Sequence, residues 1–374
     1  MKDIVNIVAA NIRQRRRALK MTQKELAEKL NYSEKAISKW ESGLGLPPSV
    51  TLPALARALA VDIDSLMNNP SDIRYYLGID GGGTKTEFVL ADRDGNIVKR
   101  TVLTGCNPID IGFQGMFDVL RQGIFEVCGE IPFRYISVFA GLAGGITGSN
   151  AQRINEFFEQ YHFGKTANGS DAQNAVAISL LGNNGITVIM GTGAIGFVQN
   201  GEALNRVGGY GYMFSDEGSG FCIGRDAITA ALQAEDGSGP NTCLYEMVRE
   251  KCGSDKILDY LGSFYQGGKR LIASYAPLMF EAYEQGDSVA KELLYRNMRA
   301  IAKLIVGGAK HLPDEPIINV ALCGGITRNK EIILPIIEEC LKSESNRQYN
   351  ITVCERSIAH GALLLAGMEY KENI

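Results

Sequence analysis

The chain lacks the residue patterns of metal-bound and disulfide-bonded domains. Its eight cysteines are scattered through 374 residues without a single Cys-x-x-Cys pair. Its three histidines, at positions 162, 311 and 360, show no metal-ligand spacing. Zinc ribbons and disulfide scaffolds need regularly spaced cysteines or histidines, so neither class fits this sequence. The scattered cysteines instead predict reduced thiols in a cytoplasmic protein.

Long apolar runs and a signal peptide are missing as well. No stretch approaches the roughly 20 apolar residues that cross a bilayer, and the N-terminal segment is amphipathic and basic. We therefore expect a cytoplasmic protein without a membrane partner.

The charge of the chain is unevenly distributed. Residues 1–70 carry 11 Lys and Arg against 7 Asp and Glu, a net charge of +4, whereas the rest carries 27 against 35, a net charge of −8. A basic head on an acidic body predicts that only the head meets a polyanion.

Two glycine loops in the body share one frame. In each, a strand-like run is followed by a glycine loop, a second run and a hairpin turn: 75–80, Gly81-Gly82-Gly83-Thr84, 86–91 and Asp94-Gly95 in the first, and 186–190, Gly191-Thr192-Gly193-Ala194, 195–199 and Asn200-Gly201 in the second. Glycines after a strand let backbone amides approach an anion closely. Each loop alone fits a tight hairpin without a ligand, but the repeat predicts two lobes that hold the phosphates of a nucleotide between them. A P-loop or a dinucleotide fingerprint would need a following helix, and a strand follows here.

Residues 1–70 have the pattern of a small helical domain. Helices are expected over 4–19, 23–30, 34–41, 51–60 and 63–67. Thr22 and Glu25 form a capping box, and Ser33 caps the next helix. Two short helices joined by a short turn predict a helix-turn-helix, with a helical protein-interaction bundle as the alternative.

The exposed side of these helices predicts DNA contacts. The expected DNA-binding residues are Gln23 and Lys24 for phosphates, and Ser33, Glu34, Lys35, Ser38 and Lys39 for the major groove. The segments 22–27 and 37–43, together with Leu46-Pro47, resemble the Cro/phage-repressor type of helix-turn-helix, the Xre family, over residues 9–67. The resemblance implies operator binding as a dimer.

Strands and helices alternate beyond a short linker near residue 70. Strands are expected over 75–80, 86–91, 97–102, 135–140, 186–190, 195–199, 317–323 and 350–354. Helices are expected over 113–129, 151–160, 172–182, 222–234, 255–267, 270–284, 288–308, 328–342 and 357–369. This mixture predicts α/β lobes with partly parallel sheets.

Three polar or glycine-rich segments of the body are candidates for chemistry. Asp171 comes just before a helix, where it could accept the proton of an attacking hydroxyl or simply cap the helix. Asp216 lies in a glycine-rich loop, which suits either sugar hydroxyls or a capped structural turn. Gly324-Gly325 ends a strand with bare backbone against which an adenosine could lie.

In this order, the motifs of residues 74–370 resemble the N-acetylglucosamine kinases and BadF/BadG-type ATPases of the actin-like, hexokinase-like superfamily. The resemblance implies a small all-α helix-turn-helix domain followed by a two-lobed α/β actin-like ATPase fold of the ribonuclease H-like type. It places a DNA-binding domain at 1–70, a first lobe at 74–183 with 357–374, and a second lobe at 184–356.

The resemblance also implies site residues, with ATP and Mg²⁺ as cofactors and an amino sugar as substrate. Asp171 would be the catalytic base, and Asp80 would hold Mg²⁺ through water. The phosphates of ATP would be bound by Gly81, Gly82, Gly83, Thr84, Lys85, Thr86, Gly191, Thr192 and Gly193. Adenosine would meet Gly324 and Gly325, and the sugar would meet Asn107, Gly209, Asp216 and Glu217.

Two positions depart from the family pattern, since Ser170 stands where the family usually has Asn and Ala194 where it usually has Ser. The cluster cysteines of iron–sulfur activators and the zinc motif of the winged-helix repressor–kinases are missing. The sequence favours a dimeric DNA-binding regulator fused to an ATP-dependent amino-sugar kinase. The alternative is a sensor of sugar and ATP whose catalytic site has decayed.

Overall fold

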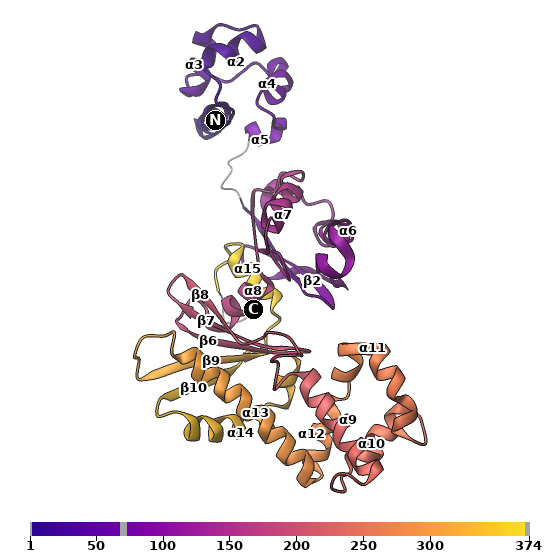
Figure 1. The fold of residues 1–374 in the computed structure, drawn as a ribbon. Helices are drawn as coiled ribbons and strands as arrows, with labels where there is room; N and C mark the ends of the chain where they lie inside the picture. Colours follow the sequence, from indigo (N-terminus) through magenta and orange to yellow (C-terminus); the bar gives the residue numbers. More distant parts are fainter. Residues whose placement is uncertain (1, 68–72, 371–374) are drawn as a thin grey trace. The chain divides into compact units, whose positions relative to one another are not determined.

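The computed structural model describes residues 2–67 and 73–370 (Figure 1). Contacts between Cα atoms divide the chain into two compact units. The first runs to Gly169 and takes up the chain again from Ala366, and the second runs from Ser170 to Leu365. Within the described ranges, no helix is both long and apolar enough to cross a membrane.

The N-terminal helices have a hydrophobic core of their own. They are α1 (Lys2–Ala18), α2 (Gln23–Leu30), α3 (Glu34–Glu41), the 3₁₀ turn η1 (Ser49–Thr51), α4 (Leu52–Ala58) and α5 (Ile63–Met67). Their buried side chains recur three and four residues apart, and include Val8, Ile12, Leu26, Leu30, Ile37, Trp40, Leu55, Leu59 and Leu66. The predicted helix-turn-helix is confirmed.

Helices α2 and α3, and the turn between them, are capped as the sequence predicts. The Thr22 hydroxyl accepts a hydrogen bond from the Glu25 amide at 3.1 Å, and the Thr22 amide donates to the Glu25 carboxylate at 2.6 Å. Asn31 ends α2 in the left-handed conformation, with φ of 55°. Ser33 then caps α3 by accepting from the Ala36 amide at 3.2 Å. These caps fix where the two helices begin and end.

The first unit contains a five-stranded sheet in the order β3-β2-β1-β4-β5. Its strands are β1 (Tyr75–Gly81), β2 (Lys85–Asp92), β3 (Ile97–Thr104), β4 (Ile136–Leu142) and β5 (Lys165–Gly169). Strands β1, β2 and β3 are antiparallel, whereas β4 and β5 run parallel to β1. Helices α6 (Pro108–Cys128) and α7 (Asn150–Glu159) bury one face of this sheet in a single core.

The second unit repeats the same strand arrangement. Its sheet has the order β10-β9-β6-β7-β8, with β6 (Gly185–Met190), β7 (Ala194–Asn200), β8 (Ala203–Val207), β9 (Ile317–Cys323) and β10 (Gln348–Val353). Again the first three strands form an antiparallel meander, and the last two run parallel to the first. The repeated frame of the two glycine loops therefore reflects a repeated sheet, and the predicted pair of α/β lobes is confirmed.

Helices cover both faces of the second sheet. Helix α13 (Ser288–Ala309) packs on one face, where Ile186 and Val188 point, and α14 (Lys330–Glu344) packs against it. Helix α8 (Asp171–Leu180) packs on the face of the alternate residues, where Ser179 bonds to Thr187 at 2.7 Å, and α15 (Ala359–Leu365) packs on α8. Side chains of one strand alternate between the two faces, so both faces are buried.

The remaining helices form a group beyond the end of α13 (Figure 1). They are α9 (Gly220–Asp236), α10 (Leu244–Cys252), the 3₁₀ turn η3 (Ile257–Tyr260), α11 (Leu261–Ala273) and α12 (Ala276–Glu284). The sequence predicted two helices, 255–267 and 270–284, and this division is wrong. Helix α11 continues through a glycine kink at Gly268, and the break falls at Ser274-Tyr275 instead.

Some elements differ from their predicted bounds. Strands β5 and β8 and helix α10 were not predicted, the last helix is shorter than 357–369, and the short turn η4 (Gly325–Asn329) precedes α14. The units also group α8 and α15 with the second sheet, whereas the sequence assigned both to the first lobe.

Candidate functional site

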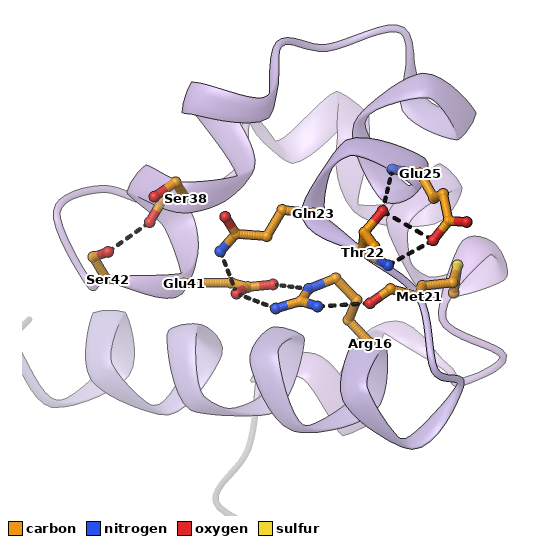
Figure 2. A network of polar contacts seen from close by, with 8 residues as sticks. All are labelled: Arg16, Met21, Thr22, Gln23, Glu25, Ser38, Glu41 and Ser42. Atoms are coloured by element: carbon orange, nitrogen blue, oxygen red, sulfur yellow. Dashed lines mark hydrogen bonds and ion pairs between the residues drawn. The ribbon is translucent and has the colours of Figure 1, made fainter.

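A buried ion pair joins the first helix of the head to the end of α3 (Figure 2). The Arg16 guanidinium donates to both carboxylate oxygens of Glu41, at 2.6 and 2.9 Å, and to the carbonyl of Met21 at 2.6 Å. The Gln23 amide donates to the same carboxylate at 2.8 Å. Burial disfavours the charge of Glu41, but the hydrogen bonds from Arg16 and Gln23 outweigh it and hold the pKa of Glu41 below its ordinary value. This network fixes α3 against α1.

The head presents most of the predicted DNA-contacting residues to solvent. Lys24, Ser33, Glu34, Lys35 and Lys39 are exposed, on and just before α2 and α3. Ser38 is half-buried, and its carbonyl accepts the Ser42 hydroxyl at 2.6 Å. The side chain of Gln23 is tied to Glu41, so its backbone amide at the start of α2 is the group left to meet a phosphate.

The first glycine loop leaves the sheet at the carboxyl end of β1. Its glycine at position 81 is forced by packing, since a Cβ there would lie 2.4 Å from the Cys106 sulfur and 2.5 Å from Leu142. Gly82 and Gly83 are half-buried, and Thr84 and Lys85 are exposed. Ligands of α/β sheets bind beyond the carboxyl ends of parallel strands, where this loop lies.

Of the two predicted site residues that flank this loop, Thr86 is buried and Asp80 is half-buried. Thr86 is fully buried, and its hydroxyl donates to the Thr104 carbonyl at 2.8 Å, so this side chain does not face a phosphate. Asp80 is half-buried at the end of β1, opposite Glu87 in the ladder. It lies just before the loop, as a carboxylate that approaches a phosphate-bound cation must.

Asn107 caps helix α6 at the same edge of the first sheet. Its side-chain oxygen accepts from the Ile109 amide at 3.0 Å and lies 3.7 Å from where a Cβ on Gly144 would be. Asn107 is therefore close to the loop that follows β4. The side chain is half-buried, and its amide nitrogen is a hydrogen-bond donor.

Asp171 is the first residue of α8, two positions after β5 ends. The capping role that sequence reasoning weighed for it belongs to Ser170, whose amide donates to Gln173 at 2.9 Å. One oxygen of Asp171 accepts from the Ala172 amide at 3.0 Å. Burial raises the pKa of the Asp171 carboxyl above its ordinary value despite this bond. A carboxylate that is held at the start of a helix and whose pKa is raised by burial fits a proton acceptor.

The second glycine loop is held by hydrogen bonds to the N-terminus of helix α9. The carbonyls of Gly191 and Thr192 accept hydrogen bonds from the amides of Gly220 and Phe221, at 2.8 and 3.2 Å, at the N-terminus of α9. In a trans peptide the carbonyl and the next amide point in opposite directions. The amides of Thr192 and Gly193 therefore point away from α9, as two neighbouring donors. Such successive amides form an anion-binding concavity.

Asp216 lies beside this second loop and carries a partner that the sequence did not reveal. Its carboxylate is 4% exposed, and it accepts from the Lys269 ammonium at 3.0 Å. Both groups touch the loop, since a Cβ on Gly193 would lie 3.1 Å from the carboxylate and 3.3 Å from the ammonium. Glu217, the next residue, is exposed. In the sequence, only the glycines near Asp216 and Lys269 indicate that these two segments can pack closely.

The loop around Asp216 is fixed by a series of hydrogen bonds and ion pairs that runs through the buried side chains of Asn297 and Asp226. The Asn297 side-chain oxygen accepts from the Gly218 amide at 2.9 Å, and its nitrogen donates to Asp226 at 2.8 Å. Asp226 in turn pairs with Arg225 and Arg296, each at 2.9 Å. Gly209, upstream of this loop, has φ of 67°, and a Cβ there would lie 2.6 Å from Ile195. Sequence reasoning missed Asn297 because its partners lie far away in the chain.

The glycine pair after β9 adjoins the second loop. Gly324 has φ of 103°, and a Cβ there would lie 2.5 Å from the Met190 carbonyl at the end of β6. Gly325 has open space where a side chain would be, and it is exposed. The backbone here can therefore be approached closely by a flat ring.

Each sheet presents a glycine loop at the carboxyl end of its first strand, where a phosphate can approach the backbone. At Gly193 the position of a Cβ adjoins Asp216 and Lys269, whereas at Gly81 it would collide with the buried side chains of Cys106 and Leu142. No group of three His, Cys, Asp or Glu side chains gathers as a metal cage among the described residues. Mg²⁺ in phosphate-transfer sites is usually held by one or two carboxylates together with phosphates and water, so a site for it needs no such cage.

Comparison with known proteins agrees with this division. The BadF/BadG/BcrA/BcrD ATPase family model matches residues 77–366, and a helix-turn-helix family model matches residues 12–66. The N-acetylmuramic acid/N-acetylglucosamine kinase of Clostridium acetobutylicum is 30% identical over 237 residues, which cover 61% of this chain and 77% of that protein. The transcriptional activator BcrR of Enterococcus faecalis is 42% identical over 57 residues, which cover 15% of this chain and 28% of BcrR.

A solved structure from Chromobacterium violaceum, assigned as an N-acetylglucosamine kinase, has a TM-score of 0.60 at 26% identity. The match covers 79% of this chain and 99% of that one. The chain belongs to the BadF/BadG/BcrA/BcrD ATPase family and carries a helix-turn-helix domain ahead of the family's ATPase domain.

Proposed function

We propose that this protein is a DNA-binding transcriptional regulator whose body is an ATP-dependent kinase of an amino sugar of the N-acetylglucosamine type. The observation that carries the proposal is Asp171, a carboxylate whose pKa is raised by burial and which lies at the start of α8, two residues after β5 ends and next to the helix cap Ser170. The relatives that act on N-acetylated amino sugars support the substrate class.

Asp171 is the proton acceptor in this proposal. Its carboxylate takes the proton of a sugar hydroxyl as that oxygen attacks the terminal phosphorus. ATP supplies the phosphoryl group. Burial raises the pKa of Asp171, which makes the carboxylate a stronger base than that of an exposed aspartate.

The glycine loops are the phosphate-binding elements. Gly81, Gly82, Gly83, Thr84 and Lys85 form the first, and Gly191, Thr192 and Gly193 form the second. Asp80 holds Mg²⁺ through water, and Gly324 and Gly325 meet the adenosine. Since little covalent chemistry falls to the protein in phosphoryl transfer, positioning and charge carry most of the rate.

The sugar is bound by polar groups near both loops. Asn107 donates from its amide, Asp216 and Glu217 accept from hydroxyls, and Gly209 lets the ring approach the backbone. Asp216 suits this role because its carboxylate is buried and held in one orientation by Lys269.

The head binds operator DNA as part of a homodimer, through Gln23, Lys24, Ser33, Glu34, Lys35, Ser38 and Lys39. Binding of the sugar changes the affinity for DNA, by no more than the sugar's preference for one arrangement of the body over another.

The test is ATP consumption by the full chain over a panel of hexoses and amino sugars, with Asp171→Asn beside the wild type. We expect turnover with an N-acetylated amino sugar, and its loss in Asp171→Asn with ATP binding retained. Asp255→Asn, at an exposed position of the same unit, is the matched control and should keep full turnover. Undiminished turnover in Asp171→Asn would remove that residue from its role. Absence of turnover on every sugar, with a sugar-dependent change in DNA affinity, would favour a sensor without catalysis.

A further inference from the structure

Lys269 has no role in the function proposed above apart from orienting Asp216, although its ammonium lies at the second glycine loop. We propose that Lys269 is a nucleotide-phosphate ligand, anchored by Asp216 and presented beside Gly193. This inference rests on the proposed function only in taking ATP as the nucleotide.

The contacts place a positive charge beside the second glycine loop. The Lys269 ammonium lies 3.3 Å from the position of a Cβ on Gly193 and 3.0 Å from the Asp216 carboxylate. The amides of Thr192 and Gly193 point away from α9, because the preceding carbonyls bond to it. An ammonium has three donors, and the bond to Asp216 uses one of them. Lysine is a common phosphate ligand as a point charge.

The two partners of the ion pair are not equally buried. The Asp216 side chain is 4% exposed, whereas the Lys269 side chain is 33% exposed. A buried carboxylate fixes one end of the ammonium, and the other end remains accessible.

The backbone on both sides of the pair adopts conformations that most residues avoid. Asp216 itself has φ of 84°, which is rare for any residue other than glycine. Gly268, next to Lys269, has φ of 57° and ψ of −150°, and it interrupts helix α11 there. Strained backbone concentrates at ligand-binding positions, where the surrounding structure maintains it. Here it directs Lys269 from a kinked helix toward the loop.

The aromatic ring of Tyr212 lies near the Lys269 ammonium. Its centroid lies 5.6 Å from the Lys269 nitrogen, and the ring packs on Phe221 at 4.9 Å between centroids. Phe221 donates its amide to the Thr192 carbonyl of the loop. The lysine, the aromatic pair and the loop therefore form one contiguous group in the second unit.

The experiment is calorimetric titration of the full chain with ATP and with adenosine, with Mg²⁺ and without sugar. Lys269→Met should weaken ATP by about ten- to a hundredfold, the usual effect of removing a hydrogen bond to a charged group, and leave adenosine unchanged. Lys269→Arg should retain most of the ATP affinity. Lys342→Met, at an exposed position on α14, should change neither ligand.

Lys269→Met leaves the Asp216 carboxylate buried without its partner, so the double variant Asp216→Asn/Lys269→Met is titrated beside it. We expect the same selective loss of ATP affinity in the double variant. Equal losses of ATP and adenosine, or no loss of either, would overturn the inference. Wild-type binding of ATP without transfer to any sugar would refute the kinase and leave this inference standing. A wild type that binds adenosine as tightly as ATP would refute the inference itself.

Discussion

The ion pair between Arg16 and Glu41 predicts how the head loses stability. In Glu41→Ala, Arg16 loses two hydrogen bonds, at 2.6 and 2.9 Å, and Gln23 loses one at 2.8 Å. The Arg16 side chain is 11% exposed, so its charge remains largely buried without a counter-ion. Removing one partner of a buried pair costs about 3–5 kcal/mol.

The lower end of that range applies here. Arg16 keeps its bond to the Met21 carbonyl at 2.6 Å and reaches some water, so we expect about 3 kcal/mol. A domain of this size is stable by only about 3–10 kcal/mol in total. Glu41→Ala should therefore remove about a third or more of the stability of the head.

The chain offers a probe that reports on the head alone. Trp40 is the single tryptophan of the 374 residues, and it lies in the core of the head with 5% exposure. Its fluorescence in a urea titration of the full chain follows unfolding of the head without interference from the body. With a slope of about 1 kcal/mol per molar urea for a small domain, the midpoint should fall by about 3 M.

Two control variants separate the ion pair from a general effect of substitution. Glu28→Ala removes an exposed carboxylate on α2 and should leave the midpoint in place. Arg16→Met/Glu41→Leu removes both charges and should recover most of the loss, because the buried charge is gone with its partner. An unchanged midpoint in Glu41→Ala would refute the reasoning, since it would mean that the pair contributes nothing.

Three further predictions concern the body. Burial raises the pKa of Asp171, and a base must be ionised to accept a proton. The kcat/KM of the kinase should therefore fall on the acid side at a pH above 3.8, the ordinary pKa of an aspartate. A pH–rate profile whose acid limb lies at or below 3.8 would contradict the role of Asp171. Gly324→Ala would place a Cβ 2.5 Å from the Met190 carbonyl at φ of 103°, so ATP affinity measured by titration should fall at least about tenfold, and retained affinity would show that the strand ends can shift. Asn297→Ala leaves the Gly218 amide without its partner, while Asp226 keeps Arg225 and Arg296. The thermal midpoint of the body should fall by the equivalent of about 1–3 kcal/mol and the KM for sugar should rise, and an unchanged KM would separate this residue from the Asp216 loop.

The local parts of the fold were predictable from the sequence. Thr22, Glu25 and Ser33 specify the helix-turn-helix through caps that act within four residues. The glycine loops after 75–80 and 186–190 were recognisable because alternating strands flank each of them. Strand β8 was not predicted because its side chains are almost all exposed and show no apolar alternation.

The contacts between distant segments were not predictable. Lys269 and Asp216 are 53 residues apart, and nothing in either segment specifies that they meet. The same holds for Asn297 and Gly218, which are separated by 79 residues. Thr86 was expected at a phosphate from the family resemblance, but its side chain is fully buried in β2, where six consecutive residues are buried. Spacing along a chain indicates local geometry, whereas burial depends on the packing of the whole unit.

The central claim is that the body transfers phosphate to an amino sugar with Asp171 as the base. The most direct measurement is mass spectrometry of the sugar after incubation of the full chain with ATP, Mg²⁺ and N-acetylglucosamine. The account predicts a phosphorylated sugar with the wild type and with Asp255→Asn, and none with Asp171→Asn. The same phosphorylated product from Asp171→Asn, in the same amount, would contradict it.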